Sequence, residues 1–197
     1  MYILSSSKFK GFLPFRWSYS RNIIREVNSA VSKLDTIYMK LALRQAQAGY
    51  REKEIPVGVV VVGSDGRVLA ANRNKVNALQ DEEMQAEIQC LRRARRALGS
   101  NCLKNCTLYT TLEPCARCVN YILDARISRV VYGVSDSVCG RATLLSSHAG
   151  NLEGGSTDVV GGILEKDCEH LIRSYYMSIG VGESVGSYSR GLNLVVC

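Results

Sequence analysis

Hydrophobic and polar positions along this chain form blocks that switch between a helical and a strand pattern. From Asp35 to Gly49 the apolar residues recur near helical spacing, and Gly49 marks the end of the predicted helix. The valine-rich run from Pro56 to Val62 indicates a strand that is buried on both faces. A turn signal, Ser64-Asp65-Gly66, then leads into Arg67 to Ala71, which indicates the returning strand of a hairpin.

The second half of the chain continues this alternation. A polar stretch over 72–83 leads into a helix predicted from about Met84 to Leu98, with Gly99 as its terminator. Residues 135–158 are polar and glycine-rich, and they predict a loop of the length usually reserved for function or mobility. The other predicted elements are a strand over Cys106–Leu112, a helix from about Cys115, a strand over Arg129–Val134 and a helix over Glu165–Met177.

This order of elements is typical of an α/β protein. We predict a three-layer α/β/α fold in which one mixed sheet lies between helices. The strand–helix–strand alternation around Cys115 predicts parallel pairing of the flanking strands. The chain has 197 residues, which suits one domain. We place that domain at residues 35–180, after an extension over 1–34 and before a flexible, glycine- and serine-containing tail over 181–197.

The first 25 residues are basic and contain no acidic side chain. With serines and aromatic residues between the basic ones, they have the composition of an organelle transit peptide. A poorly ordered extension and an arm that touches RNA are equally consistent with this composition. We therefore expect an intracellular protein of the cytoplasm or nucleus, or of an organelle if the extension is a targeting signal.

The charge and hydropathy of the chain restrict its possible binding partners only slightly. The formal net charge is +7, which suits either simple solubility or an anionic partner such as RNA. No apolar run approaches the roughly 18 residues needed to cross a bilayer, so we expect no membrane partner.

The strongest chemical signal is the segment Pro114-Cys115-Ala116-Arg117-Cys118. Two cysteines three positions apart on the first turn of a helix face the same side, and the helix N-terminus stabilises thiolates. Such a pair can hold zinc at about 2.3 Å from each sulfur. Two neighbouring core cysteines or a redox pair are the alternatives.

A second motif stands about thirty residues upstream, also at a predicted helix start: Gln85-Ala86-Glu87. Zinc deaminases combine H-x-E with P-C-x-x-C, and in them the glutamate is the general acid/base rather than a ligand. Glu87 stands in the place of that glutamate, but Gln85 stands in the place of the histidine. Of the only two histidines, we expect His170 on a solvated helix face, and His148 is the better replacement ligand.

On these motifs the chain resembles the tRNA adenosine deaminase family of the cytidine deaminase superfamily, over roughly residues 36–180. Further segments carry the resemblance: Ile55 to Gly58, Ala70 to Asn74, Thr107 to Tyr109, Thr111 to Cys115, Arg129 to Gly133 and Gly161 to Leu164. The resemblance implies zinc-dependent deamination of adenosine to inosine at the wobble position of tRNA. It also implies a dimer, either a homodimer or a heterodimer with a related deaminase subunit.

The same resemblance implies a role for each site residue. Cys115 and Cys118 would hold zinc, and Glu87 would move the proton. Asn74, eleven positions before Gln85, would contact the substrate, as would Glu113 beside the pocket. A strand-end asparagine such as Asn74 may equally be only a turn residue.

Gln85 departs from the family pattern, because an amide oxygen is a weaker zinc ligand than an imidazole nitrogen. Three explanations are open. The chain is inactive; it uses Gln85 as a poor ligand or recruits another residue; or the sequence carries an error at this codon. The alternative functions are a deaminase of small molecules such as cytosine or guanine, and a non-catalytic subunit of a tRNA deaminase heterodimer. The arginines at 92, 93, 95 and 96 suit either phosphate binding or a solvated helix face.

Overall fold

The computed structural model of this chain describes residues 21–147 and 157–180, with side chains described from Lys33 onward, Ser147 excepted. The chain divides after Ser32 into two units, and the unit that begins at Lys33 holds the sheet.

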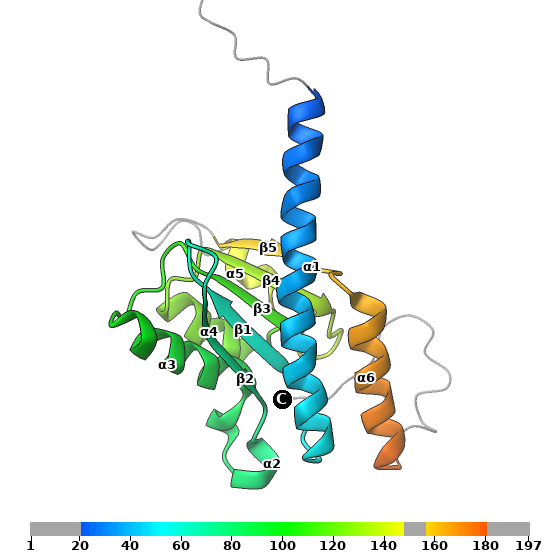
Figure 1. The fold of residues 1–197 in the computed structure, drawn as a ribbon. Helices are drawn as coiled ribbons and strands as arrows, with labels where there is room; N and C mark the ends of the chain where they lie inside the picture. The colour runs from blue at the N-terminus through cyan, green and yellow to red at the C-terminus, as the bar shows by residue number, and fades with distance from the viewer. Residues whose placement is uncertain (1–20, 148–156, 181–197) are drawn as a thin grey trace, which may run out of the picture. The chain divides into compact units, whose positions relative to one another are not determined.

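One mixed sheet of five strands forms the centre of this unit within the described ranges (Figure 1). In spatial order the strands are β2 (Val68–Arg73), β1 (Gly58–Val62), β3 (Thr107–Leu112), β4 (Arg129–Val134) and β5 (Asp158–Val160). β1 pairs antiparallel with both β2 and β3, whereas β3 pairs parallel with β4 and β4 with β5. The predicted mixed sheet and the parallel pairing around Cys115 are therefore confirmed.

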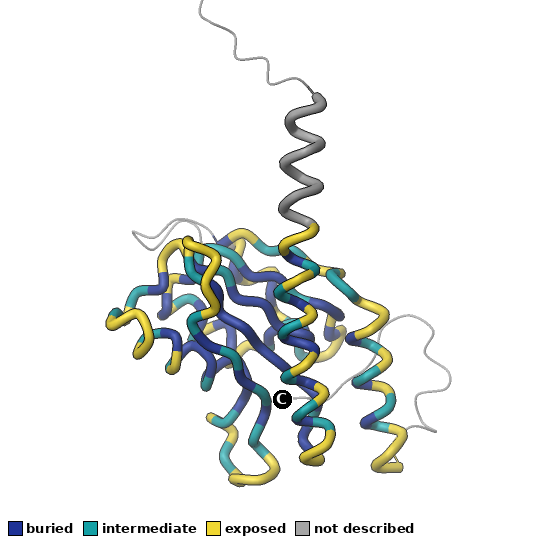
Figure 2. Tube along the Cα trace, in the orientation of Figure 1, coloured by how far each residue is buried: buried dark blue, intermediate teal, exposed yellow. Residues whose placement is uncertain are grey.

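Helices cover both faces of the sheet (Figure 1). The part of α1 (Arg21–Arg51) from Lys33 on and α6 (Glu165–Ser178) lie on one face, and α3 (Ala86–Leu98) and α4 (Ala116–Asp124) lie on the other. β1 is buried along its whole length, as its run of valines predicts (Figure 2). A Cβ atom on Gly58 would collide with the backbone of α1 at Ala42 and Ala46, so glycine permits this close approach.

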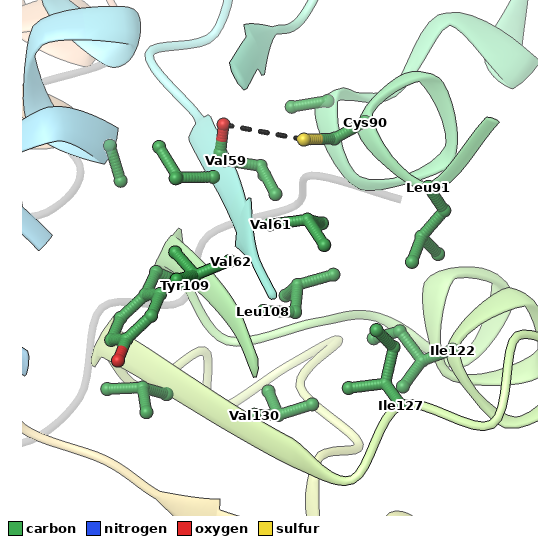
Figure 3. Packing of buried hydrophobic residues seen from close by; sticks show 14 of the residues in the cluster. Val59, Val61, Val62, Cys90, Leu91, Leu108, Tyr109, Ile122, Ile127 and Val130 are labelled. Carbon is green, nitrogen blue, oxygen red and sulfur yellow. Dashed lines mark hydrogen bonds between the residues drawn. The ribbon is translucent and has the colours of Figure 1, made fainter. Parts of the chain in front are cut away.

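The core between the sheet and α3 fixes the helix that carries Glu87. Figure 3 shows Leu91 of this helix facing the apolar side chains of β1 and β3. The buried Cys90 thiol donates to the carbonyl oxygen of Val59 at 3.7 Å and ties α3 to β1. Burying each large apolar side chain stabilises the folded state by about 1.5–3 kcal/mol. This packing against the sheet therefore fixes the position of the first turn of α3.

The buried carboxylate of Asp35 connects α1 to β3 and β4. Its two oxygens accept from Nη1 and Nη2 of Arg129 at 2.7 and 2.9 Å, and the hydroxyl of Tyr109 donates to it at 2.9 Å. Arg129 also pairs with Asp158 of β5, at 3.0 Å. One arginine thus joins α1, β4 and β5.

Most of the predicted elements are found with ends that differ by at most two residues. The first helix is longer than predicted, because α1 begins at Arg21 and takes in the last part of the predicted extension. Residues 1–20 and the predicted tail over 181–197 lie outside the described residues, and the targeting role stays a prediction. None of the described helices is long and apolar enough to cross a membrane.

The loop predicted over 135–158 is wrong in part, because it contains α5 (Thr143–Ser147) and the first residue of β5. A three-residue strand has no periodicity to detect, and it forms here through pairing with β4, a tertiary effect that overrides local pattern. The polar stretch over 72–83 likewise contains α2 (Val76–Leu79) and the start of a short 3-10 helix, η1 (Glu82–Met84).

Candidate active site

The N-terminal ends of α3 and α4 meet beside the end of β3. Gln85 is the N-cap residue of α3, and Cys115 is the N-cap residue of α4. The Oε1 atom of Gln85 lies 3.4 Å from Sγ of Cys118 and 4.0 Å from Sγ of Cys115. The two motifs, thirty positions apart in the sequence, therefore form one site.

Glu87 lies on the first turn of α3 and is buried. Its pKa is raised to about 7, mainly by burial and also by the charge of nearby Cys115, while a hydrogen bond from the Thr110 hydroxyl at 3.1 Å opposes the rise. A carboxyl group with a pKa near neutrality can both take up and release a proton, as general acid/base catalysis requires. Thr110 was not predicted as a site residue, and its only signal is a hydroxyl inside a buried strand.

The two thiols differ strongly in acidity. A hydrogen bond from Cys118 lowers the pKa of Cys115 to about 5, helped by the backbone N–H groups of Cys118 and Arg117 and by the Gln85 amide, and opposed by burial. The same Cys115–Cys118 hydrogen bond, together with burial, raises the pKa of Cys118 well above its ordinary value. Near neutral pH and without metal, the pair therefore holds one proton, with the thiolate on Cys115.

Asn74 and Glu113, the predicted substrate-binding residues, both support backbone around the site. Oδ1 of Asn74 accepts from the backbone N–H of Ala86 at 2.8 Å and so satisfies a free donor at the start of α3. The two carboxylate oxygens of Glu113 accept from the backbone N–H groups of Asp136 and Ala142, each at 3.1 Å. A direct contact of Asn74 or Glu113 with substrate stays a prediction.

The predicted site residues all line one small inner cavity of about 20 Å³. A space of this size holds little more than a water molecule or an ion. Its lining consists of Val57, Asn74, Gln85, Glu87, Leu112, Glu113, Cys115, Cys118 and Asp136. Asp136, which the sequence did not single out, completes this polar lining.

A larger outer pocket of about 490 Å³ lies against the inner cavity, since Gln85 and Cys115 line both. Its volume falls within the range of roughly 300–1,000 Å³ that small-molecule sites occupy. The other lining residues are Ala116, Arg117, Asn120, Val138, Cys139 and Arg141. The site thus combines a small inner cavity with an outer pocket of the size that small molecules occupy.

Whether zinc fits this site depends on Gln85. Within the described part of the chain, no three His, Cys, Asp or Glu side chains gather where they could hold a metal ion. Tetrahedral zinc, with Zn–S near 2.3 Å and Zn–O near 2.1 Å, places sulfur and oxygen about 3.6 Å apart. The observed 3.4 and 4.0 Å from Gln85 Oε1 to the two sulfurs lie on either side of this value. The distances from Gln85 Oε1 to the two sulfurs therefore fit a shared zinc ion, and the amide oxygen is the weak donor.

No described histidine replaces Gln85. His170 is exposed on α6, as predicted, and lines a separate hollow with residues of α1. His148 lies outside the described residues.

Residues 32–134 match the family described as the cytidine and deoxycytidylate deaminase zinc-binding region, and the chain belongs to this family. Within it, the chain is similar to tRNA-specific adenosine deaminases. It is 34% identical over 152 residues to that of Agrobacterium fabrum, an alignment that covers 72% of this chain and 93% of the relative.

Two further comparisons show how much of this chain and of its relatives the similarity covers. The chain is 35% identical over 176 residues to a tRNA(Ile)-lysidine synthase of Deinococcus deserti, which covers 87% of this chain but only 32% of that protein. A solved structure from a study of A-to-I editing by tRNA:A34 deaminases is 36% identical, with a TM-score of 0.63, covering 69% of this chain and 99% of that one. The predicted cytidine-deaminase-like fold is thereby confirmed.

Proposed function

We propose that this chain is a zinc-dependent deaminase that hydrolyses adenosine to inosine at the wobble position of a tRNA. The observation that carries the proposal is the shared inner cavity, in which Glu87 lies beside the two cysteines and Gln85. The similarity to tRNA-specific adenosine deaminases and to a structure from a study of tRNA:A34 deaminases supports tRNA as the substrate.

The residues of the inner cavity would have different roles in this reaction. Cys115 and Cys118 would hold zinc through their sulfurs, with Oε1 of Gln85 as a weak third ligand. Zinc, when bound, would supply a lowered pKa for the attacking water. Glu87 accepts a proton from this water and delivers it to the base, so that water and adenosine yield inosine and ammonia.

Asn74 would bind the substrate directly, and Glu113 would hold the backbone around the cavity. Since Oδ1 of Asn74 is bound to the backbone N–H of Ala86, the Nδ2 donors of Asn74 are the groups it can offer to a base or ribose. Glu113 would act by holding the segment from Asp136 to Ala142 over the site.

The substitution Gln85→His tests the ligand assignment. An imidazole nitrogen binds zinc more strongly than an amide oxygen, so Gln85→His should raise zinc affinity by ~10-fold or more. Bound zinc is measured by metal analysis of purified protein, and inosine by nucleoside analysis of a tRNA transcript. Both are expected to rise, whereas Glu87→Gln, the control, should keep zinc but lose inosine formation. Equal zinc in the wild type and Gln85→His would contradict the ligand role.

The second candidate is a non-catalytic subunit of a tRNA deaminase heterodimer. It is favoured by one observation: the described residues offer only two strong zinc ligands at the site. This candidate predicts that the wild type binds tRNA without zinc and forms no inosine alone, and that a related deaminase subunit restores activity. Assays with free cytosine and guanine separate both candidates from a small-molecule deaminase.

A further inference from the structure

Two arginines stand in the outer pocket, and their surroundings differ. Arg117 forms an ion pair with Glu82, so its charge is neutralised. Arg141 is exposed, and none of the ion pairs among the described residues includes it. Arg141 is therefore a cation at the pocket without a carboxylate partner in the described part of the chain.

The guanidinium of Arg141 is held by one of its nitrogens. Nη1 donates to the backbone carbonyl oxygens of Gly140 and Val138, at 2.6 and 3.2 Å. Nε and Nη2 make no hydrogen bond within the described residues, so the Nε–Nη2 edge is available. That edge presents two parallel N–H donors, the arrangement that binds two oxygens of one phosphate group.

The backbone of Arg141 is tied to the segment that carries the site cysteines. Its N–H group donates to the carbonyl oxygen of Pro114 at 2.9 Å, and Gly140 forms an antiparallel bridge with Cys115. A Cβ atom on Gly140 would collide with the Glu113 carboxylate, so this close packing requires glycine. The position of Arg141 is thus fixed relative to the inner cavity.

A second hollow lined by arginines lies at the end of α3, away from this pocket. It measures about 500 Å³ and is lined by Arg92, Arg95, Arg96 and residues 99–101. Arg92 pairs with Glu83 and Arg95 with Asp124, so two of its three arginines are already neutralised. Arg96 is exposed and forms no ion pair among the described residues, which makes it a matched control for Arg141.

We infer that Arg141 binds a backbone phosphate of the RNA substrate beside the nucleotide whose base enters the inner cavity. Arg141 would thereby favour a polynucleotide over a free nucleoside or base. This inference rests on the proposed function, because it takes the substrate to be RNA and the inner cavity to be the place of reaction.

Binding of a fluorescently labelled anticodon stem-loop RNA tests the inference without requiring turnover. Arg141→Ala removes one charged phosphate contact, so the affinity should fall about tenfold. The slope of log affinity against log salt concentration should fall in magnitude by about 1. Arg141→Gln, which keeps a side chain able to bond the carbonyls of Val138 and Gly140, should show the same loss. Circular dichroism and thermal melting check that both variants are folded.

Arg96→Ala should leave the affinity and the slope unchanged. The inference is overturned if Arg141→Ala and Arg141→Gln bind like the wild type, or if Arg96→Ala causes an equal loss. It is also overturned if adenosine monophosphate displaces the RNA as effectively as unlabelled stem-loop does, which would assign the phosphate to a free nucleotide. Wild-type protein that binds RNA in an Arg141-dependent way but forms no inosine would sink the proposed catalysis and leave the phosphate site standing.

Discussion

At the scale of single residues, the site shifts acidities in opposite directions within one small cavity. Burial raises the pKa of Glu87 to about 7, whereas the hydrogen bond from Cys118 lowers the pKa of Cys115 to about 5. The first shift suits a group that exchanges protons, and the second suits a thiolate that binds a metal. Residue types alone predicted both roles, and the start of a helix predicted a stabilised thiolate on the cysteines. The burial that raises the pKa of Glu87 could not be predicted, because it depends on how the start of α3 packs in the fold.

The low pKa of Cys115 predicts selective alkylation in metal-free protein. At pH 6–7 its thiolate form dominates, since this lies above a pKa of about 5, so Cys115 should react with iodoacetamide well before other thiols. Cys90 is the internal control, because burial raises its pKa to about 12. Peptide mass spectrometry follows each cysteine over time.

Zinc should protect Cys115 from the reagent. If alkylation of Cys115 at pH 6 is as slow as that of Cys90, the proposed thiolate at this position is wrong.

At the scale of elements, the pattern of hydrophobic and polar residues predicted the helices and strands that have a clear local signal. It missed those that form only by pairing or packing with other elements. The β4 strand, Arg129–Val134, was predicted with the observed bounds because it is a short apolar run between polar ends. The short β5 and α5 were missed, since pairing and packing stabilise them. The site residues show the same difference. Both helix starts were predicted, whereas only the fold brings Thr110 to Glu87 and Asp136 to the cavity.

The ion pair of Asp35 with Arg129 predicts a large loss of stability when one partner is removed. Arg129→Ala would leave a buried carboxylate with only Tyr109 as partner, which should cost about 3 kcal/mol of unfolding free energy. Urea denaturation measures the loss. Arg67→Ala removes an arginine that is 82% exposed and should cost less than about 1 kcal/mol. Equal costs for the two variants would show that the Asp35 network does not fasten α1.

At the scale of the whole molecule, the mixed sheet is what brings the chemistry together. Antiparallel β1 and β3 place α3 beside α4 on one face, so two motifs thirty positions apart share a cavity. The net charge of +7 fits the proposed RNA substrate, as does Arg141, which has no carboxylate partner among the described residues. Whether the active form is a homodimer or a heterodimer stays a prediction that sedimentation of the purified chain, alone and with a related subunit, would test.

X-ray absorption at the zinc edge tests the central claim most directly, because it counts the ligand atoms whatever the activity. The account predicts two sulfur neighbours near 2.3 Å and two oxygen neighbours near 2.0–2.2 Å, one of them from Gln85. Gln85→His should keep the two sulfurs and replace one oxygen by an imidazole nitrogen. A zinc shell without sulfur, or with four sulfurs, would contradict the account.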